Sequence, residues 1–214
     1  MKTFLIATRN AHKVGEIRSI LGGEFQFLTL NDFPGAPPVI EDAATFAGNA
    51  TKKAVELARW LQTPPLKSLP PDLWVMADDS GLEVDALNGA PGVYSARFAA
   101  VDQFKDGNTP DADNNAKLLR VLRAAPAEKR TARFRCAIAV TPVETEPHTQ
   151  LFDGACEGCI DFSARGQGGF GYDPLFIPAG FEQSFAELGE AVKDRISHRA
   201  QALGKLKPWL AVRH

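Results

Sequence analysis

Hydrophobic residues along the chain recur with two periods, one typical of buried strands and the other of amphipathic helices. Residues 4–7 form an uninterrupted apolar run, which predicts a buried strand. Within residues 11–21 the apolar side chains recur at helical spacing, at Val14, Ile17, Ile20 and Leu21. Asn10 stands where a helix N-cap is expected. The chain is therefore predicted to begin with a strand followed directly by a helix.

A long helix is predicted from Ala43 to Leu61, after a second strand and a proline-rich loop at residues 33–38. Five residues give this helix one apolar face: Phe46, Ala50, Ala54, Leu57 and Leu61. Three basic residues lie off that stripe: Lys52, Lys53 and Arg59. Residues 64–71 hold four prolines and predict a loop.

The middle of the chain predicts two β segments, at residues 73–77 and 82–87, with Asp78-Asp79-Ser80-Gly81 interrupting them. Asn88-Gly89 predicts a turn. Residues 101–113 are rich in Asp, Asn and Gly and predict an exposed excursion, which a helix at residues 114–123 follows.

Apolar residues alternate from residue 132 to 140, which predicts a half-buried strand, and residues 151–160 are expected to pair with it antiparallel. A glycine-rich loop at residues 165–171 leads to a short strand at 175–177, and a final helix begins at Ser197. Because strands and helices interleave, we expect a single α/β domain over residues 1–214 with a mixed sheet. A division into two lobes around a cleft stays open.

Composition narrows the function classes. The formal net charge is -2 and the pI is about 6.1, which argues against a general nucleic-acid binder. The three cysteines do not suggest a disulfide framework, and the Cys156/Cys159 pair lacks two further ligands for a zinc site. The N-terminal apolar run is too short for a signal peptide or a membrane span, so we expect a cytoplasmic protein.

The segment from Thr8 to Lys13 lies between the first strand and the first helix. A helix N-terminus offers backbone N–H groups and a partial positive charge, and Lys13 adds a full charge, which together suit a triphosphate. The segment lacks the glycines of a Walker A loop. The alternative is a simple capped helix with a solvated lysine.

Two adjacent carboxylates, Asp78 and Asp79, follow a predicted buried strand. Ligands commonly bind at strand ends in α/β sheets. Adjacent strand residues point in opposite directions, so one Asp should face a ligand while the other serves the structure. A carboxylate there can hold Mg²⁺ or take a proton from water. The alternative is a polar turn in which these side chains cap backbone groups.

Two further segments carry candidate binding residues. The glycines around Phe170 allow backbone to approach a ligand closely and leave the ring able to stack on a base, although a tight loop with a buried aromatic is the alternative. Ser197 is a candidate N-cap that places His198 and Arg199 in the first helical turn. Arginine only donates hydrogen bonds, and so selects acceptors such as a purine 6-oxo group. A solvated basic helix start is the alternative there.

These segments occur together and in a fixed order, and the sequence closely resembles the inosine/xanthosine triphosphate pyrophosphatases. The matching stretches span residues 8–203: TRNAHK, E-x-x-x-TF-x-x-NA-x-x-KA at residues 41–54, ADDSGLEVDALNGAPGVYSAR, GGFGYDPLF and ISHRAQAL. The resemblance implies an elongated α/β fold with a mixed central sheet flanked by helices, two lobes and an active-site cleft between them. It also implies Mg²⁺ as cofactor, a homodimer, and hydrolysis of ITP, dITP and XTP to the monophosphate and pyrophosphate.

The resemblance also assigns roles by motif position. Asp79 is the expected catalytic carboxylate, and it shares the metal with Glu41. The remaining substrate-binding residues are Thr8, Arg9, Asn10, Ala11, His12, Lys13, Ser80, Phe170, Gly171, Tyr172, Asp173, Lys193, His198 and Arg199. Thr8, Asn10 and Lys13 should contact the phosphates, and Phe170 should stack on the base with Tyr172 and Asp173 completing the pocket. Lys193, His198 and Arg199 should bind the nucleotide from the opposite wall.

Two other functions remain open. A hydrolase of the same fold could prefer modified pyrimidine triphosphates, which a substrate panel would separate. A nucleotide sensor would bind without turnover and would be expected to lose Asp79 or Glu41, both of which are present. We expect a small-molecule partner rather than nucleic acid or a membrane.

Overall fold

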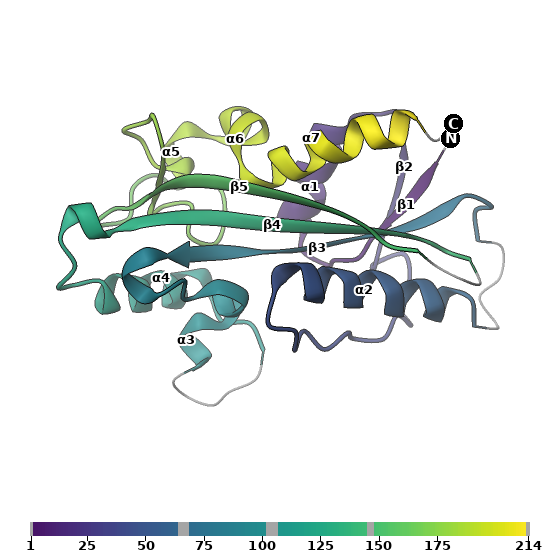
Figure 1. The fold of residues 1–214 in the computed structure, drawn as a ribbon, viewed down its shortest axis with the longest axis horizontal. Coiled ribbons are helices and arrows are strands. Elements are labelled where there is room, and N and C mark those ends of the chain that lie inside the picture. Colours follow the sequence, from purple (N-terminus) through teal and green to yellow (C-terminus); the bar gives the residue numbers. More distant parts are fainter. Residues whose placement is uncertain (1, 64–68, 102–106, 145–147, 213–214) are drawn as a thin grey trace. The chain divides into compact units, whose positions relative to one another are not determined.

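The strands of this protein join in one mixed sheet, in the order β2-β1-β3-β4-β5-β6. The computed structural model describes residues 2–63, 69–101, 107–144 and 148–212 (Figure 1). The strands are β1 (Thr3–Ile6), β2 (Gln26–Thr29), β3 (Leu73–Val84), β4 (Thr131–Pro142), β5 (Gln150–Ile160) and β6 (Phe176–Pro178). The α-helices are α1 (Ala11–Leu21), α2 (Phe46–Leu61), α3 (Phe98–Val101), α4 (Asp111–Val121), α5 (Phe185–Leu188), α6 (Glu190–Ile196) and α7 (His198–Ala211). The predicted α/β class with a mixed sheet is confirmed.

The sheet is parallel at one end and antiparallel at the other. β1 pairs parallel with both β2 and β3. The Val143 N–H, just after β4, donates to the Leu73 carbonyl at the start of β3 (3.0 Å), so β4 runs antiparallel to β3. The Ile160 N–H donates likewise to the Arg130 carbonyl (2.9 Å), so β5 returns antiparallel to β4 as predicted. β6 pairs antiparallel with β5.

The chain divides into two compact units. Unit 1 comprises Met1–Asp79, Cys136–Gly154 and Arg199–His214, and unit 2 comprises Ser80–Arg135 and Ala155–His198. Strands β3, β4 and β5 each contribute residues to both units. Each unit has an apolar core of its own, and each is described separately below.

Unit 1 has helices on both faces of its strands. Trp74 and Met76 of β3 pack in the core beneath α1 and α7, whereas Val75 and Ala77 pack in the core against α2. This alternation follows from the two-residue period of a strand. Figure 1 shows α2 on one side of these strands and α1 and α7 on the other. Because helices cover both faces of β3 here, residues on both faces are apolar, and this part of its sequence is a continuous apolar run.

Unit 2 is built around packed aromatic rings. The ring of Phe134 lies 4.7 Å from that of Phe176, which stacks on Phe185 at 5.4 Å between ring centroids. The Tyr172 ring joins this core, and its hydroxyl donates to the Ser95 carbonyl (2.8 Å). A capping box at Ser184 starts the short helix α5, which the apolar pattern did not predict.

Three sequence predictions about element boundaries are wrong. Asp78-Asp79-Ser80-Gly81 does not interrupt a strand, because β3 runs unbroken from Leu73 to Val84. Residues 85–87, the end of the β segment predicted at 82–87, form a 3₁₀ turn instead. Helix α4 begins at Asp111, so the end of the predicted excursion at residues 101–113 is helical. Residues 102–106 of that excursion and 64–68 of the proline-rich loop lie outside the described residues.

Other predictions are confirmed. Helix α1 has the predicted bounds and Asn10 caps it, while α2 starts three residues later than predicted, with Thr45 as its N-cap. Asn88 adopts a left-handed conformation (φ 52°) in the predicted turn. Among the described helices, none combines the length and the hydropathy needed to cross a membrane.

Candidate active site

Asp78 and Asp79 lie side by side in β3, and their side chains point to opposite faces of the sheet. Asp78 contacts residues of α1 and α7, and Asp79 contacts residues of α2. Both are buried, with 4% and 7% of their surface exposed. Two adjacent aspartates can be buried in the middle of β3 because each carboxylate has its own charged partners, all of which are distant in sequence.

Asp78 is ionised and bonds to several elements of unit 1. Its carboxylate accepts hydrogen bonds from Lys13 Nζ, from Arg199 Nε (3.0 Å) and Nη2 (3.3 Å), and from the Cys136 thiol (3.1 Å). Burial disfavours the charge, but Arg199 and Lys13 outweigh it and hold the pKa of Asp78 well below its usual value. Burial, followed by the charge of Asp78, raises the pKa of Cys136, which keeps that thiol protonated.

Arg199 is fully buried at the start of α7. Beyond its bonds to Asp78, its Nη1 donates to the carboxylate of Glu16 on α1. The guanidinium thus ties α7, β3 and α1 together within unit 1. Any contact of Arg199 with a purine base, as predicted, would have to use N–H groups other than those bonded to Asp78 and Glu16.

Asp79 has a different environment on the α2 face. Its carboxylate accepts from Asn49 Nδ2 (3.1 Å) and Lys53 Nζ (3.4 Å). Burial raises the pKa of Asp79 to about 6, with the negative charge of Glu41 adding to the shift and Lys53 opposing it. A carboxyl that titrates near neutrality can exchange a proton during a reaction. Unit 1 thus brings together Asp79 and Glu41, the two predicted metal ligands.

Lys53 is a residue of this cluster to which the sequence analysis assigned no role. It was expected to lie off the apolar stripe of α2, but it is 8% exposed, because its ammonium enters the acidic cluster. Its Nζ donates to the Asp78 carbonyl (2.8 Å) and lies 3.2 Å from Glu41 Oε2. Burial disfavours the charge of Glu41, but Lys53 outweighs it and lowers the pKa of Glu41. The spacing of Asn49 and Lys53, four residues apart on one helix face, is the signal that could have found it.

The Thr8–Lys13 segment caps its own helix. The Asn10 side chain accepts from the backbone N–H groups of His12 (2.9 Å) and Lys13 (3.3 Å). The Thr8 hydroxyl accepts from the Asn10 N–H (3.1 Å). Two of the N–H groups expected to face a phosphate are therefore already bonded. The side chains of residues 9–12 are exposed, whereas that of Lys13 is 17% exposed beside Asp78.

Unit 2 brings three of the predicted base-binding residues together. Lys193 Nζ lies 2.5 Å from Asp173 Oδ2 and 4.2 Å from the centroid of the half-buried Phe170 ring. The Asp173 carboxylate also accepts from the Phe170 N–H (2.9 Å). A cation over one face of the ring adds attraction beyond packing. The loop thus presents Phe170 in a defined orientation.

The glycines of this loop pack against the protein itself. A Cβ on Gly169 (φ 74°) would lie 2.2 Å from Asp173 Oδ2, and one on Gly168 would lie 2.9 Å from the Ala186 carbonyl oxygen. A Cβ on Gly171 (φ 62°) would meet no described atom within 4 Å. The first two glycines therefore allow a close approach of protein groups, where the sequence suggested approach of a ligand.

The remaining predicted residues of unit 2 have varied surroundings. Tyr172 is buried by its core contacts, and burial raises the pKa of its hydroxyl above the usual value. The His198 ring stacks on Phe134 with 4.8 Å between centroids. Ser80 follows Asp79 in β3 and is half-buried.

The residues present fit a magnesium ion of the substrate-bridging kind. Mg²⁺ is usually bound through one or two carboxylates together with phosphate oxygens of a substrate. Glu41 and Asp79 supply two carboxylates in one cluster, and Glu41 keeps 36% of its side chain exposed. Within the described ranges, no group of three or more His, Cys, Asp or Glu forms a dedicated metal site.

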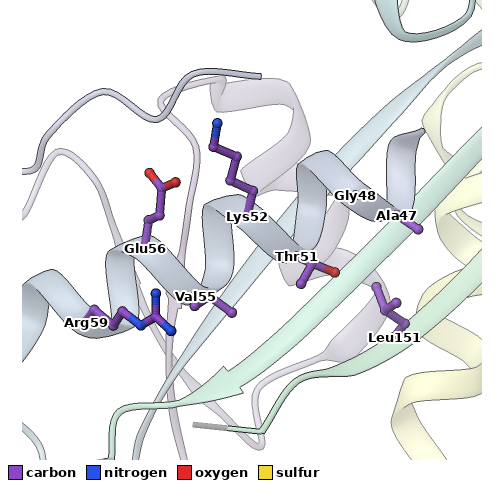
Figure 2. A pocket seen from close by; sticks show the side chains of 8 residues that line it. All are labelled: Ala47, Gly48, Thr51, Lys52, Val55, Glu56, Arg59 and Leu151. Atoms are coloured by element: carbon purple, nitrogen blue, oxygen red, sulfur yellow. The ribbon is translucent and has the colours of Figure 1, made fainter. Parts of the chain in front are cut away.

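A groove lies alongside α2, where the helix faces Leu151 of β5 (Figure 2). Seven of the residues that line it come from α2 and one from β5: Ala47, Gly48, Thr51, Lys52, Val55, Glu56, Arg59 and Leu151. None of the predicted site residues lines this groove. We assign it no part in the reaction.

Comparison with known proteins identifies the relatives of this chain. A sequence model of the Ham1 family matches residues 4–209. A dITP/XTP pyrophosphatase of Desulforamulus reducens is 48% identical over 202 residues, which cover 94% of this chain and 92% of that protein. One from Geobacillus kaustophilus is 46% identical over 207 residues, covering 96% and 93%. The solved structure of a HAM1 protein from Coxiella burnetii matches with a TM-score of 0.80 at 36% identity over 99% of each chain.

Proposed function

The chain belongs to the Ham1 family, and we propose that it hydrolyses the non-standard purine nucleotides ITP, dITP and XTP to the monophosphate and pyrophosphate. The observation that carries this proposal is the cluster of Asp79, Glu41 and Lys53 beside the Thr8–Lys13 segment of unit 1. It combines a carboxyl with a raised pKa, a second carboxylate and a buried cation. Such a combination suits water activation at a polyphosphate.

Asp79 orients the attacking water and accepts its proton as the oxygen attacks the α-phosphorus. A pKa near 6 makes this carboxylate a stronger base than an ordinary aspartate while it stays largely ionised at pH 7. Asn49 holds one carboxylate oxygen through its amide, which fixes the direction of the other. Lys53 keeps Glu41 and Asp79 in one cluster despite their like charge.

The phosphates are bound by the start of α1. Lys13 supplies a charge close to the leaving pyrophosphate, and Thr8 and Asn10 supply polar groups at the helix N-terminus. Residues 9, 11 and 12 of the same segment line the substrate. Asp78, held by Arg199, keeps the Lys13 side chain directed toward β3.

Glu41 and Asp79 would hold magnesium, which would neutralise charge on the phosphate oxygens and lower the pKa of a bound water. The same two side chains also fix the position of the reacting water through their remaining lone pairs. Ser80 lines the substrate next to Asp79.

The purine base stacks on Phe170 in unit 2. Gly171, Tyr172 and Asp173 shape the pocket, and Lys193 and His198 contribute its polar groups. Arg199 provides donors for the 6-oxo group, which adenine lacks. A site built on such hydrogen bonds discriminates by roughly 10⁴-fold or more, because its donors are left unpaired by the wrong base.

Three further features belong to the same proposal. The protein acts as a homodimer, binds neither nucleic acid nor membranes, and works in the cytoplasm, where it removes non-standard nucleotides from the pool. Size-exclusion chromatography with light scattering tests the dimer: a mass of about twice 23.1 kDa is expected, and a monomer contradicts it.

A substrate panel tests the reaction. Purified protein with Mg²⁺ is incubated separately with ITP, dITP, XTP, GTP, ATP and a modified pyrimidine triphosphate, and the products are separated by chromatography. We expect monophosphate and pyrophosphate from the first three and little turnover of the others. Diphosphate and phosphate as products would overturn the α-phosphorus mechanism, and binding without turnover would favour a sensor.

A further inference from the structure

Helix α4 forms two hydrogen bonds with Gly171 of the base-binding loop. The Gly171 N–H donates to Asp111 Oδ2 (2.6 Å), and its carbonyl accepts from Asn115 Nδ2 (3.0 Å). Asp111 and Asn115 are four residues apart, so their side chains lie one above the other on the same helix face. One turn of α4 therefore binds both polar groups of the residue that follows Phe170.

The Asn115 amide makes this contact with only one of its two polar atoms. Its Oδ1 is buried and has no hydrogen-bond partner among the described residues, which is an unfavourable arrangement. The neighbouring Asn114 differs, because its Oδ1 accepts from the Ala99 N–H (2.8 Å) and the Thr109 hydroxyl (2.7 Å). Asn114 thus ties α4 to the segment before it, whereas the Asn115 side chain bonds, within the described residues, to the loop.

Phe170 is consequently fixed on two sides. Its own N–H donates to Asp173, whose carboxylate is in turn bound by Lys193. The peptide that follows it is bound by α4. Gly171 has a left-handed conformation (φ 62°), and a Cβ there would meet no described atom within 4 Å, while the Phe170 carbonyl accepts from the Asp173 N–H (3.3 Å). Without the two bonds from α4, the loop has fewer restraints on the direction of the Phe170 ring.

We propose that Asp111 and Asn115 are positioning residues that set base affinity and selectivity by holding the Gly171 peptide. The inference rests on the proposed function, because it needs Phe170 to stack on a purine base. Stacking strength depends on the orientation of the ring, and the phosphate chemistry of unit 1 does not involve α4. Loss of either bond therefore weakens base binding and leaves the chemical step intact.

Steady-state kinetics of four variants tests the proposal. Asp111→Ala and Asn115→Ala should each raise KM for ITP about five- to tenfold, a fraction of the full stacking contribution, with kcat within about twofold. Their preference for ITP over ATP should fall by a similar factor. Asp111→Asn keeps an oxygen acceptor for the Gly171 N–H and should restore most of the affinity. Asp113→Ala removes an exposed carboxylate from the same helical turn and should behave as the original protein.

Thermal unfolding separates positioning from general destabilisation. Asn115→Ala removes the unpaired buried oxygen along with the bond, so its midpoint should change little while its KM rises. Unchanged KM and selectivity in both alanine variants, or an equal change in Asp113→Ala, would overturn the inference and leave the hydrolase function standing. If the original protein turns over no purine triphosphate, the proposed function fails, and this inference falls with it.

Discussion

Replacing Asp79 with asparagine should stabilise the folded protein at neutral pH while it removes the activity. The pKa of Asp79 is raised from 3.8 to about 6, so ionisation of this group is less favourable in the folded state by about 2.2 units (6 − 3.8). At about 1.36 kcal/mol per unit this corresponds to at most ~3 kcal/mol above pH 7. Asparagine keeps the shape of the side chain and carries no charge, so it avoids that cost.

The pH dependence gives this prediction its sign. A raised pKa means that the folded protein binds the Asp79 proton more tightly than the unfolded chain does. The free energy of unfolding that protonated Asp79 contributes is therefore fully present below about pH 4 and is lost as the pH rises through 6. The stability advantage of Asp79→Asn should therefore grow by about 1.4 kcal/mol between pH 5 and pH 8. Below pH 4 the charge of Asp79 should make little difference between the free energies of unfolding of the two proteins.

Urea unfolding at pH 5, 6, 7 and 8 in the presence of EDTA measures the effect, because the chelator prevents metal from binding the carboxylates. Asp42→Asn is a matched control: Asp42 is exposed and pairs only with Lys52 among the ion pairs described, so its substitution should change the free energy of unfolding little. An Asp79→Asn protein that is less stable at pH 8, or whose advantage is independent of pH, would refute the reasoning.

Three further substitutions probe the rest of the cluster and the strand that carries it. Asp78→Asn should destabilise by about 3–5 kcal/mol in urea unfolding, because it removes the buried negative charge that Arg199 and Lys13 share. Lys53→Met should lower kcat and move the acid limb of the kcat/KM–pH profile upward, because removing the cation raises the pKa of Asp79; an unmoved limb would contradict this. Gly81→Ala should destabilise by about 1–3 kcal/mol in thermal unfolding, because a Cβ would lie 2.4 Å from Ser95 Oγ.

Gly15 provides the control for the glycine substitution. It lies within α1, and a Cβ there would meet no described atom within 4 Å. Gly15→Ala should therefore stabilise the protein by about 0.5–1 kcal/mol, the usual difference in helix propensity. Equal effects of the two substitutions would show that the close approach in β3 does not limit stability.

Local signals in the sequence were enough for the elements whose apolar pattern and caps agree. Helix α1 follows from the spacing of its apolar residues and from Asn10, which needs no information from elsewhere in the chain. β3 was misread because Asp78 and Asp79 look like a turn in isolation. The partners of Asp78, Lys13 and Arg199, lie 65 and 121 residues away from it in the sequence, and no local pattern reveals such pairs. Helix α5 was missed because it is too short to show a period.

The candidate site was predicted in part for a similar reason. Alternation along a strand correctly indicated that Asp78 and Asp79 would point to opposite faces, one toward structural partners. Lys53 was overlooked because a helix lysine is usually solvated, and only the buried carboxylates explain its burial. The hydrogen bonds between α4 and Gly171 could not be predicted, because Asn115 and Asp111 lie 56 and 60 residues from Gly171 in the sequence.

The central claim is that water activated by Asp79 attacks the α-phosphorus. The most direct test is hydrolysis of ITP in water enriched in ¹⁸O, with mass spectrometry of both products after a single turnover. The account predicts one ¹⁸O atom in the inosine monophosphate and none in the pyrophosphate. Label found in the pyrophosphate would place the attack at the β-phosphorus and would contradict the account.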